Sequence, residues 1–266
     1  MEPRGRVLVI AGSDSSGGAG LQADVKTITA LGGFASTVVT ALTAQNTHGV
    51  FGVIPTPPEF VELQLSLALE DIGADAVKIG MLGTRAVVDV VVRRLRSLGR
   101  PPPLVVDPVL ASGFGTPLLD AEGRSRFVKQ LLPMATLLTP NAPEAAALSG
   151  IEVRTFADMQ HAADRLLLMG PEAVLVKGGH VEGDVVVDLL RTADGLERRF
   201  ESPRLRGRPA HGTGCTLASA IAIGLAEGMT LEGAVQEARD YVVEAIRTAP
   251  PYGTGAALLN HVHGIE

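Results

Sequence analysis

The chain has 266 residues, of which 46% are hydrophobic and 20% charged, so one large core is possible and we expect a single domain over residues 1–266. A net charge of -6 argues against a general nucleic-acid binder, whose surface would be basic. The single cysteine excludes an internal disulfide and favours a reducing compartment. No apolar run resembles a signal peptide or approaches the roughly 20 residues of a membrane helix. We therefore expect a cytoplasmic protein that binds neither membrane nor nucleic acid.

The first predicted strand leads into a glycine-rich loop. Residues 7–11 are continuously apolar, as in a strand of a parallel sheet that is buried on both faces. Residues 12–20 are rich in Gly and Ser, and a helical pattern follows to Leu31. No Lys follows the last glycine, so this is not a Walker A loop. The loop either covers a substrate or is a flexible connector, and its place at the carboxyl end of a strand favours the substrate.

The remaining elements alternate between strand and helix. We predict strands at 35–41, 51–54, 76–81, 104–107, 135–138 and 173–177, and helices at 58–69, 84–98, 120–132, 156–169, 213–227 and 231–248. Residues 184–190 and 196–202 are predicted to form a hairpin around Asp194-Gly195. This pattern predicts an α/β fold with a mostly parallel, doubly wound sheet, the hairpin forming an antiparallel edge.

Polar residues recur where the predicted strands end. Asp107 follows a buried strand, so it is either a metal- or phosphate-proximal acid or a loop-capping Asp before a proline. Asn141 and Glu144 stand three residues apart at a helix start, a spacing that serves both a Mg²⁺ site and a capping box. Lys177, beside two glycines, is placed to meet a phosphate. For Lys78, inside a strand, we expect either that the side chain extends to bring its ammonium to solvent or that it pairs with a carboxylate, rather than that it does chemistry.

The segment 210–216, Ala-His-Gly-Thr-Gly-Cys-Thr, precedes an apolar helix. Its glycines allow a sharp turn and leave backbone N–H groups uncovered. The first helical turn adds unpaired donors and the positive end of the dipole, so an anion should bind here. Cys215 would lie at the mouth of that site. We interpret the segment as the place of phosphoryl transfer; the alternative is an ordinary loop-to-helix junction.

Seven stretches together resemble one family. They are residues 11–24, 43–50, 78–82, 106–109, 139–145, 176–180 and 211–216. Their order and spacing resemble the ribokinase-like superfamily, and within it the hydroxymethylpyrimidine and hydroxymethylpyrimidine-phosphate kinases of thiamin biosynthesis. The resemblance implies a three-layer αβα sandwich. It also implies an ATP- and Mg²⁺-dependent kinase that phosphorylates the hydroxymethyl group of the pyrimidine and then its monophosphate, with a homodimer as the family expectation.

The resemblance also implies roles for individual residues. The pyrimidine would lie near Gly12, Ala19, Asp24, Gln45, Met81 and Val109, with Gln45 reading its polar edge. The backbone from Gly212 through Thr213 and Gly214 to Cys215 would form the anion hole. Asp107, Asn141 and Glu144 would serve Mg²⁺ and its waters, Asn141 and Thr213 would also face the nucleotide, and Lys177 would contact phosphate. The loop Ala111-Ser112-Gly113-Phe114-Gly115 lacks the Lys or Thr that family members often carry, so the resemblance assigns no contact between it and the acceptor's phosphate.

Most members of the superfamily resemble each other in having Asp as general base where this chain has Cys215. A helix N-terminus can lower the pKa of a thiol, which would let Cys215 take the hydroxyl proton in the first phosphorylation. The second acceptor is already a phosphate oxygen and needs no base. Cys215 as a packing residue is the alternative. Two other functions stay open, a pyridoxal kinase of the same fold and a non-catalytic pyrimidine sensor.

Overall fold

The computed structural model describes residues 4–265, so both end positions of the predicted 1–266 domain lie outside the described residues. Its main sheet has the strand order β3-β2-β1-β4-β5-β6-β7-β8-β9. The strands are β1 (Arg6–Asp14), β2 (Phe34–Asn46), β3 (Gly49–Pro55), β4 (Ala76–Ile79), β5 (Leu104–Val106), β6 (Leu137–Leu138), β7 (Ala173–Val176), β8 (Val185–Thr192) and β9 (Glu197–Pro203).

The centre of the sheet is parallel and both edges are antiparallel. Strands β2, β1, β4, β5, β6 and β7 run in one direction. The β8–β9 hairpin at one edge was predicted, and a second hairpin joins β2 to β3 at the other. The strand predicted at 35–41 is longer than expected: Gln45 and Asn46 still belong to β2, because β3 turns back at once and pairs with their backbone groups.

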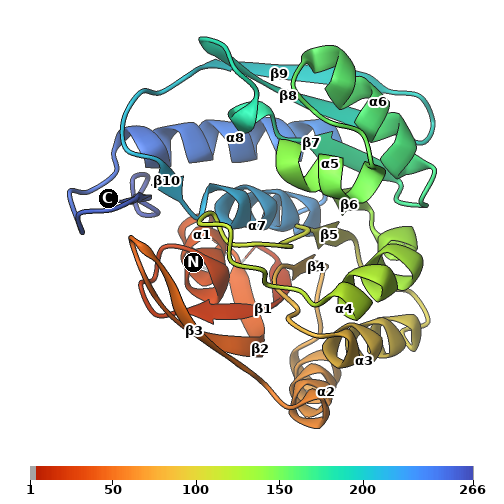
Figure 1. The fold of residues 1–266 in the computed structure, drawn as a ribbon. Coiled ribbons are helices and arrows are strands. Elements are labelled where there is room, and N and C mark those ends of the chain that lie inside the picture. The colour runs from red at the N-terminus through yellow and green to blue at the C-terminus, as the bar shows by residue number, and fades with distance from the viewer. Residues whose placement is uncertain (1–3, 266) are drawn as a thin grey trace.

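Helices cover both faces of the sheet (Figure 1). Helices α1 (Gly20–Ala30), α7 (Thr213–Ala226) and α8 (Leu231–Arg247) share one core with the sheet. Helices α2 (Pro58–Leu67), α3 (Arg85–Arg96), α4 (Ala121–Arg126), α5 (Ala142–Ser149) and α6 (Phe156–Leu167) lie over the other face. The predicted three-layer αβα arrangement is confirmed. None of the helices in the described part of the chain combines the length and apolar character that crossing a bilayer requires.

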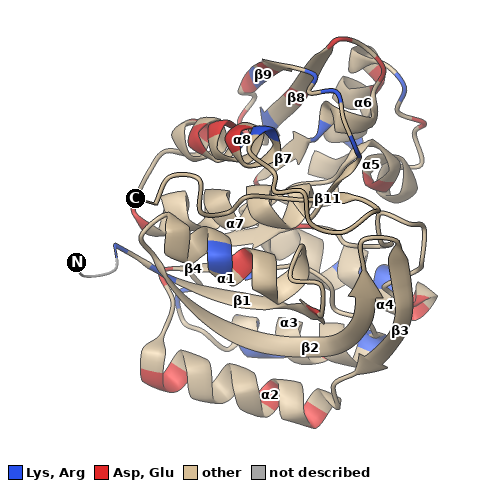
Figure 2. Ribbon diagram, turned by 90° about the vertical axis from the view of Figure 1, so that its left-hand side faces the viewer, with Lys and Arg blue, Asp and Glu red and all other residues tan. Residues whose placement is uncertain are grey.

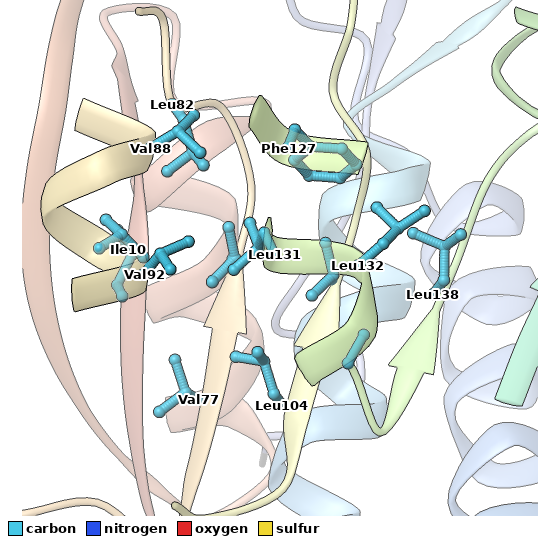
Figure 3. Close-up of a cluster of buried hydrophobic side chains, with 14 of the residues drawn as sticks. Ile10, Val77, Leu82, Val88, Val92, Leu104, Phe127, Leu131, Leu132 and Leu138 are labelled. Carbon is cyan, nitrogen blue, oxygen red and sulfur yellow. The ribbon is translucent and has the colours of Figure 1, made fainter. Parts of the chain in front are cut away.

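The core explains why the strands are so apolar. Residues 7–10 of β1 are 0% exposed because helices pack against both faces of the strand. Figure 3 shows one of the two cores, where Val92 of α3 lies beside Ile10 of β1, and the same cluster includes Phe127 and Leu131. These last two belong to a π-helical turn, Phe127–Leu131, so the helix predicted at 120–132 is not one regular α-helix.

Several helices begin, and two short strands pair, at the carboxyl ends of the parallel strands. Thr84 caps α3 by accepting a hydrogen bond from the backbone N–H of Val87. Helix α7 begins directly after Gly212, next to the short strand β10 (Ala210–His211). Strand β10 pairs with β11 (Ala257–Leu258), so the C-terminal segment lies beside the start of α7. Polar loops from distant parts of the sequence therefore meet at one end of the sheet.

Candidate active site

A cavity of about 590 Å³ opens at the carboxyl ends of the parallel strands. This is where ligands bind in open α/β sheets. Its wall contains all but one of the residues that the sequence proposed for the site: Gly12, Ala19, Gln45, Met81, Asp107, Val109, Asn141, Glu144, Lys177, Gly212, Thr213, Gly214 and Cys215. Residues up to 203 positions apart thus line one cavity, with an apolar side and a charged side.

The start of α7 is built to expose backbone donors to the cavity. Gly212 has φ +85°, a left-handed conformation that favours glycine. A Cβ at Gly212 would lie 1.8 Å from the carbonyl oxygen of Gly18, so the two loops touch through their backbones. The first intrahelical bond runs from Thr216 N–H to the carbonyl of Gly212. The amides of residues 213–215 precede that bond and are free to bind an anion.

Asp14 holds the glycine-rich loop against this anion site. Its carboxylate accepts backbone N–H bonds from Ser16, Gly18 and Ala19 at 2.7–3.1 Å. Its Oδ2 also lies 3.1 Å from Nε2 of His211. Burial alone would raise the pKa of Asp14, but the hydrogen bonds from His211 and Ser16 hold it below its ordinary value. A charged carboxylate therefore joins the loop after β1 to the segment before α7.

An ion pair forms the floor of the charged side. Nζ of Lys177 lies 2.8 Å from Oδ1 of Asp107, and Thr139 donates a hydrogen bond to the same oxygen at 3.2 Å. Burial would lower the pKa of Lys177, but Asp107 and Glu144 raise it above its ordinary value, so the ammonium stays charged. A Cβ at Gly214 would lie 3.0 Å from Nζ of Lys177. Glycine at 214 thus leaves room for a phosphate between the amides and the lysine.

Asn141 and Glu144 form the predicted capping box at the start of α5. Each side chain accepts the other residue's backbone N–H at 2.8 Å. Burial raises the pKa of Glu144 to about 7. Both residues also line the cavity.

The donor set fits a magnesium ion that arrives with a nucleotide. Among residues 4–265, no group of three or more His, Cys, Asp and Glu side chains could hold a metal by itself. The cavity does offer two carboxylates, Asp107 and Glu144, close to free amides. Mg²⁺ commonly takes one or two protein carboxylates and completes its shell with waters and phosphates. These residues therefore suit a Mg²⁺–nucleotide complex rather than a dedicated metal cage.

The opposite wall is mainly apolar with one free amide. Ser15 fixes the backbone of Gln45 by donating to its carbonyl at 2.8 Å and accepting from its N–H at 2.9 Å. The Gln45 side chain forms no hydrogen bond with the described residues and faces the cavity with Met81 and Val109. A Cβ at Gly12 would lie 2.8 Å from Sδ of Met81, so glycine there lets Met81 pack at the wall. This wall can hold a small ring and read one polar edge.

The expectation that Asp24 contacts the substrate is not met. Asp24 is 0% exposed and lies beneath the cavity, where both of its carboxylate oxygens accept hydrogen bonds from Nζ of Lys78 at 2.8 and 2.9 Å. The predicted pairing of Lys78 with a carboxylate is thereby confirmed. Asp24 lies on α1, which follows the glycine-rich loop at the cavity. Its side chain points into the interior because this face of α1 packs towards β4.

The thiol of Cys215 lies at the cavity wall, as expected, but its acidity differs from the prediction. Burial raises the pKa of Cys215 to about 11. Lys78 and the backbone N–H of Gly20 lower this pKa, but they do not overcome the effect of burial. Cys215 is therefore a thiol at neutral pH in this structure.

Several residues at the site had no role assigned from the sequence. Asp14, Ser13, Thr43, His180 and His211 lie in or beside the cavity. Asp14 and His211 had a sequence signal, since each stands within a glycine-rich motif. Their pairing spans 197 positions and only the tertiary structure could show it.

The model of the phosphomethylpyrimidine kinase family matches residues 14–260. The chain belongs to this family. A hydroxymethylpyrimidine/phosphomethylpyrimidine kinase of Streptomyces coelicolor is 46% identical over 256 residues, which is 96% of this chain and 93% of that one. A thiamine biosynthesis bifunctional protein of Geobacter sulfurreducens is also 46% identical over 99% of this chain, but the chain spans only about half (54%) of its length.

Solved structures of two enzyme types share the fold. A phosphomethylpyrimidine kinase from Clostridium difficile is 41% identical with a TM-score of 0.80, covering 91% of this chain and 99% of that one. A pyridoxal kinase from Staphylococcus aureus, in complex with AMP-PCP and pyridoxal, is 32% identical with a TM-score of 0.88, covering 97% and 93%. The family is a kinase family. The chain also shares its fold with a kinase that acts on a different substrate, pyridoxal.

Proposed function

We propose that the protein transfers the γ-phosphoryl group of ATP to the hydroxymethyl group of 4-amino-5-hydroxymethyl-2-methylpyrimidine, and then a second one to the resulting monophosphate. The observation that carries this proposal is the two-sided cavity. A backbone anion site at the start of α7 adjoins Lys177 and two carboxylates, and it faces the small apolar wall that presents Gln45. Membership of the phosphomethylpyrimidine kinase family supports the choice of substrate.

In the first transfer, the hydroxymethyl oxygen attacks the γ-phosphorus. The O–P bond to the acceptor forms, the bond to the β–γ bridging oxygen breaks, and ADP leaves with that electron pair. The acceptor's proton passes to Cys215 as general base, in the minor fraction of the protein whose thiol is deprotonated, since the thiol has a pKa of about 11. The amides of residues 213–215 stabilise the charge on the transferring group, and Lys177 contributes a fixed positive charge. When bound, Mg²⁺ would be held by Asp107, Asn141 and Glu144 through its waters and would neutralise phosphate charge.

In the second transfer, the acceptor is a phosphate oxygen that carries no proton to remove near neutral pH. The anion site and Lys177 serve again, whereas Cys215 is not required. Positioning and charge stabilisation dominate phosphoryl transfer in any case. One cavity can therefore run both steps, and the two steps differ in their need for the thiol.

The test is ADP release with Mg²⁺ and ATP against hydroxymethylpyrimidine, its monophosphate and pyridoxal, measured side by side. Turnover with both pyrimidines and little with pyridoxal supports the proposal. Turnover mainly with pyridoxal overturns the substrate assignment and favours the second candidate, for which the pyridoxal kinase likeness at a TM-score of 0.88 is the supporting observation. Pyrimidine binding without ADP release in any reaction points to a sensor.

We also propose a homodimer that works in the cytoplasm. The β2–β3 edge carries no charged residue (Figure 2), and Phe51 and Ile54 on it are 72% and 68% exposed. A second copy covering this edge would bury them. Light scattering after size-exclusion chromatography should give twice the chain mass of 27.6 kDa. A mass equal to one chain would contradict the dimer.

A further inference from the structure

A fully buried ion pair lies beneath the reacting end of the cavity. Lys78 of β4 and Asp24 of α1 are each 0% exposed. Both oxygens of Asp24 accept from Nζ of Lys78, and Ser219 of α7 donates to Oδ1 at 2.7 Å. Three secondary-structure elements therefore fix the position of one ammonium group.

Stability does not explain this pair. Removing two charges from water costs several kcal/mol per ion, and apolar residues of similar volume at such positions often give an equally stable or more stable fold. Its neighbours on β4, Val77 and Ile79, are fully buried apolar residues. We therefore look for a function of this lysine in the adjoining cavity, whose wall it helps to form.

The ammonium lies close enough to Cys215 for the two groups to shift each other's pKa. Ser219, which holds Asp24, stands four residues after Cys215 on α7 and so lies on the same helix face. Lys78 itself lines the cavity together with Cys215. Lysine has three N–H donors, of which Asp24 engages two, and no other partner of Nζ occurs among the described residues. Gly80 leaves space over it, since a Cβ there would lie 3.1 Å from Nζ.

We propose that Lys78 is a positioning residue for the first phosphorylation: its ammonium, clamped by Asp24 and Ser219, supplies the fixed positive charge that stabilises the Cys215 thiolate. This deepens the proposed function and rests on it for the kinetic consequence. The clamp keeps the ammonium from turning towards the phosphates, which Lys177 serves.

The other charged groups around the thiol make Lys78 the main opposing influence. Burial raises the pKa of Cys215, Lys78 lowers it, and Asp24 and Asp107 raise it; the N–H of Gly20 bonds to the sulfur and lowers it. A thiolate at Cys215 also raises the pKa of Lys177, which follows β7. Glu144 of α5 and His211 of β10 face the same cavity. Without Lys78, burial and two carboxylates would act on the sulfur with little compensation.

The experiment measures thiolate formation directly, because Cys215 is the only cysteine in the chain. Alkylation of the substrate-free protein by iodoacetamide is followed between pH 7.5 and 9.5, where the rate is proportional to the thiolate fraction. The variants are Lys78→Met and the double variant Lys78→Met/Asp24→Asn, which leaves no unpaired buried charge. An opposite charge nearby shifts a pKa by about 1–3 units, so we expect alkylation at least about tenfold slower in Lys78→Met. The slowing should be smaller in the double variant, which also removes the Asp24 charge that raises the pKa of the thiol.

A merely structural role predicts the opposite sign, since a loosened cavity would expose the sulfur and speed alkylation. Thr27→Val is the matched control. Thr27 is buried on the same helix as Asp24, and its hydroxyl bonds the carbonyl of Ala23 and the hydroxyl of Tyr241 rather than a group of the cavity wall, so the alkylation rate should match the wild type. Rates in the folded double variant equal to or above wild type would overturn the proposal.

Steady-state kinetics then distinguish the effect of Lys78 on the thiol from the proposed kinase activity. Turnover of hydroxymethylpyrimidine should fall by about tenfold in Lys78→Met and by less in the double variant, and in both variants turnover of the monophosphate should fall much less. Equal losses for both acceptors would overturn the proposal. If neither pyrimidine is a substrate but alkylation slows as expected, the proposed function fails while the link between Lys78 and the thiol stands.

Discussion

Replacing Gly212 by alanine should disable both phosphorylation steps, because this residue sets the contact between two loops. The new Cβ would lie 1.8 Å from the carbonyl oxygen of Gly18, whereas non-bonded atoms pack at about 3.5 Å. The loops must therefore separate by more than about 1 Å, and misplacement on that scale costs about 100-fold in rate. The residue's φ of +85° adds about 1–2 kcal/mol of backbone strain.

Gly228→Ala is the matched control, at the far end of α7. Gly228 has φ +84°, but a Cβ there meets nothing within 4 Å. It should show the same strain, worth a few degrees in Tm at about 2–4 °C per kcal/mol, with kcat unchanged. Steady-state ADP release should fall about 100-fold or more with each acceptor for Gly212→Ala alone. Equal activity of the two variants would refute the argument that the Gly18–Gly212 contact positions the anion site.

Two further predictions concern ionisable groups. Cys215→Ala should slow the first phosphorylation more than the second; in the wild type, whose thiol has a pKa of about 11, the first step should accelerate as pH rises from 7 to 9 while the second changes little. Equal losses, or parallel pH profiles, would count against a general base. Glu144→Gln should stabilise the fold at pH 8. The carboxyl has a folded pKa of about 7 and an ordinary value of 4.5, so the wild type loses stability as pH rises between these values. Thermal denaturation should show the variant's advantage vanish below about pH 4.5; a constant advantage would contradict the assigned pKa.

Much of the fold was accessible from the sequence because the signals are local. Continuous apolar runs such as residues 7–11 mark strands buried on both faces, and caps such as Thr84 mark helix starts. Since these strands are parallel, their carboxyl ends meet at one edge, and Asp107, Asn141 and Lys177 follow three of them. Their meeting in one cavity followed from the alternation of strand and helix.

What the sequence did not predict depends on contacts across the fold. The extension of β2 through Asn46 requires a partner, β3, to satisfy its backbone groups. The direction in which Asp24 points is set by how α1 packs on β4, and the acidity of Cys215 is set by burial that no local pattern reports. The link between Asp14 and His211 joins two motifs whose spacing in the chain carries no sign of contact.

The central claim is that one cavity phosphorylates the pyrimidine twice. Its most direct test is a ³¹P NMR time course of the protein with Mg²⁺, ATP and an equimolar mixture of hydroxymethylpyrimidine and pyridoxal. The account predicts a pyrimidine monophosphate that rises first and then declines as a diphosphate signal grows, with pyridoxal left largely unphosphorylated. Accumulation of pyridoxal phosphate, or a pyrimidine monophosphate that never proceeds to the diphosphate, would contradict it.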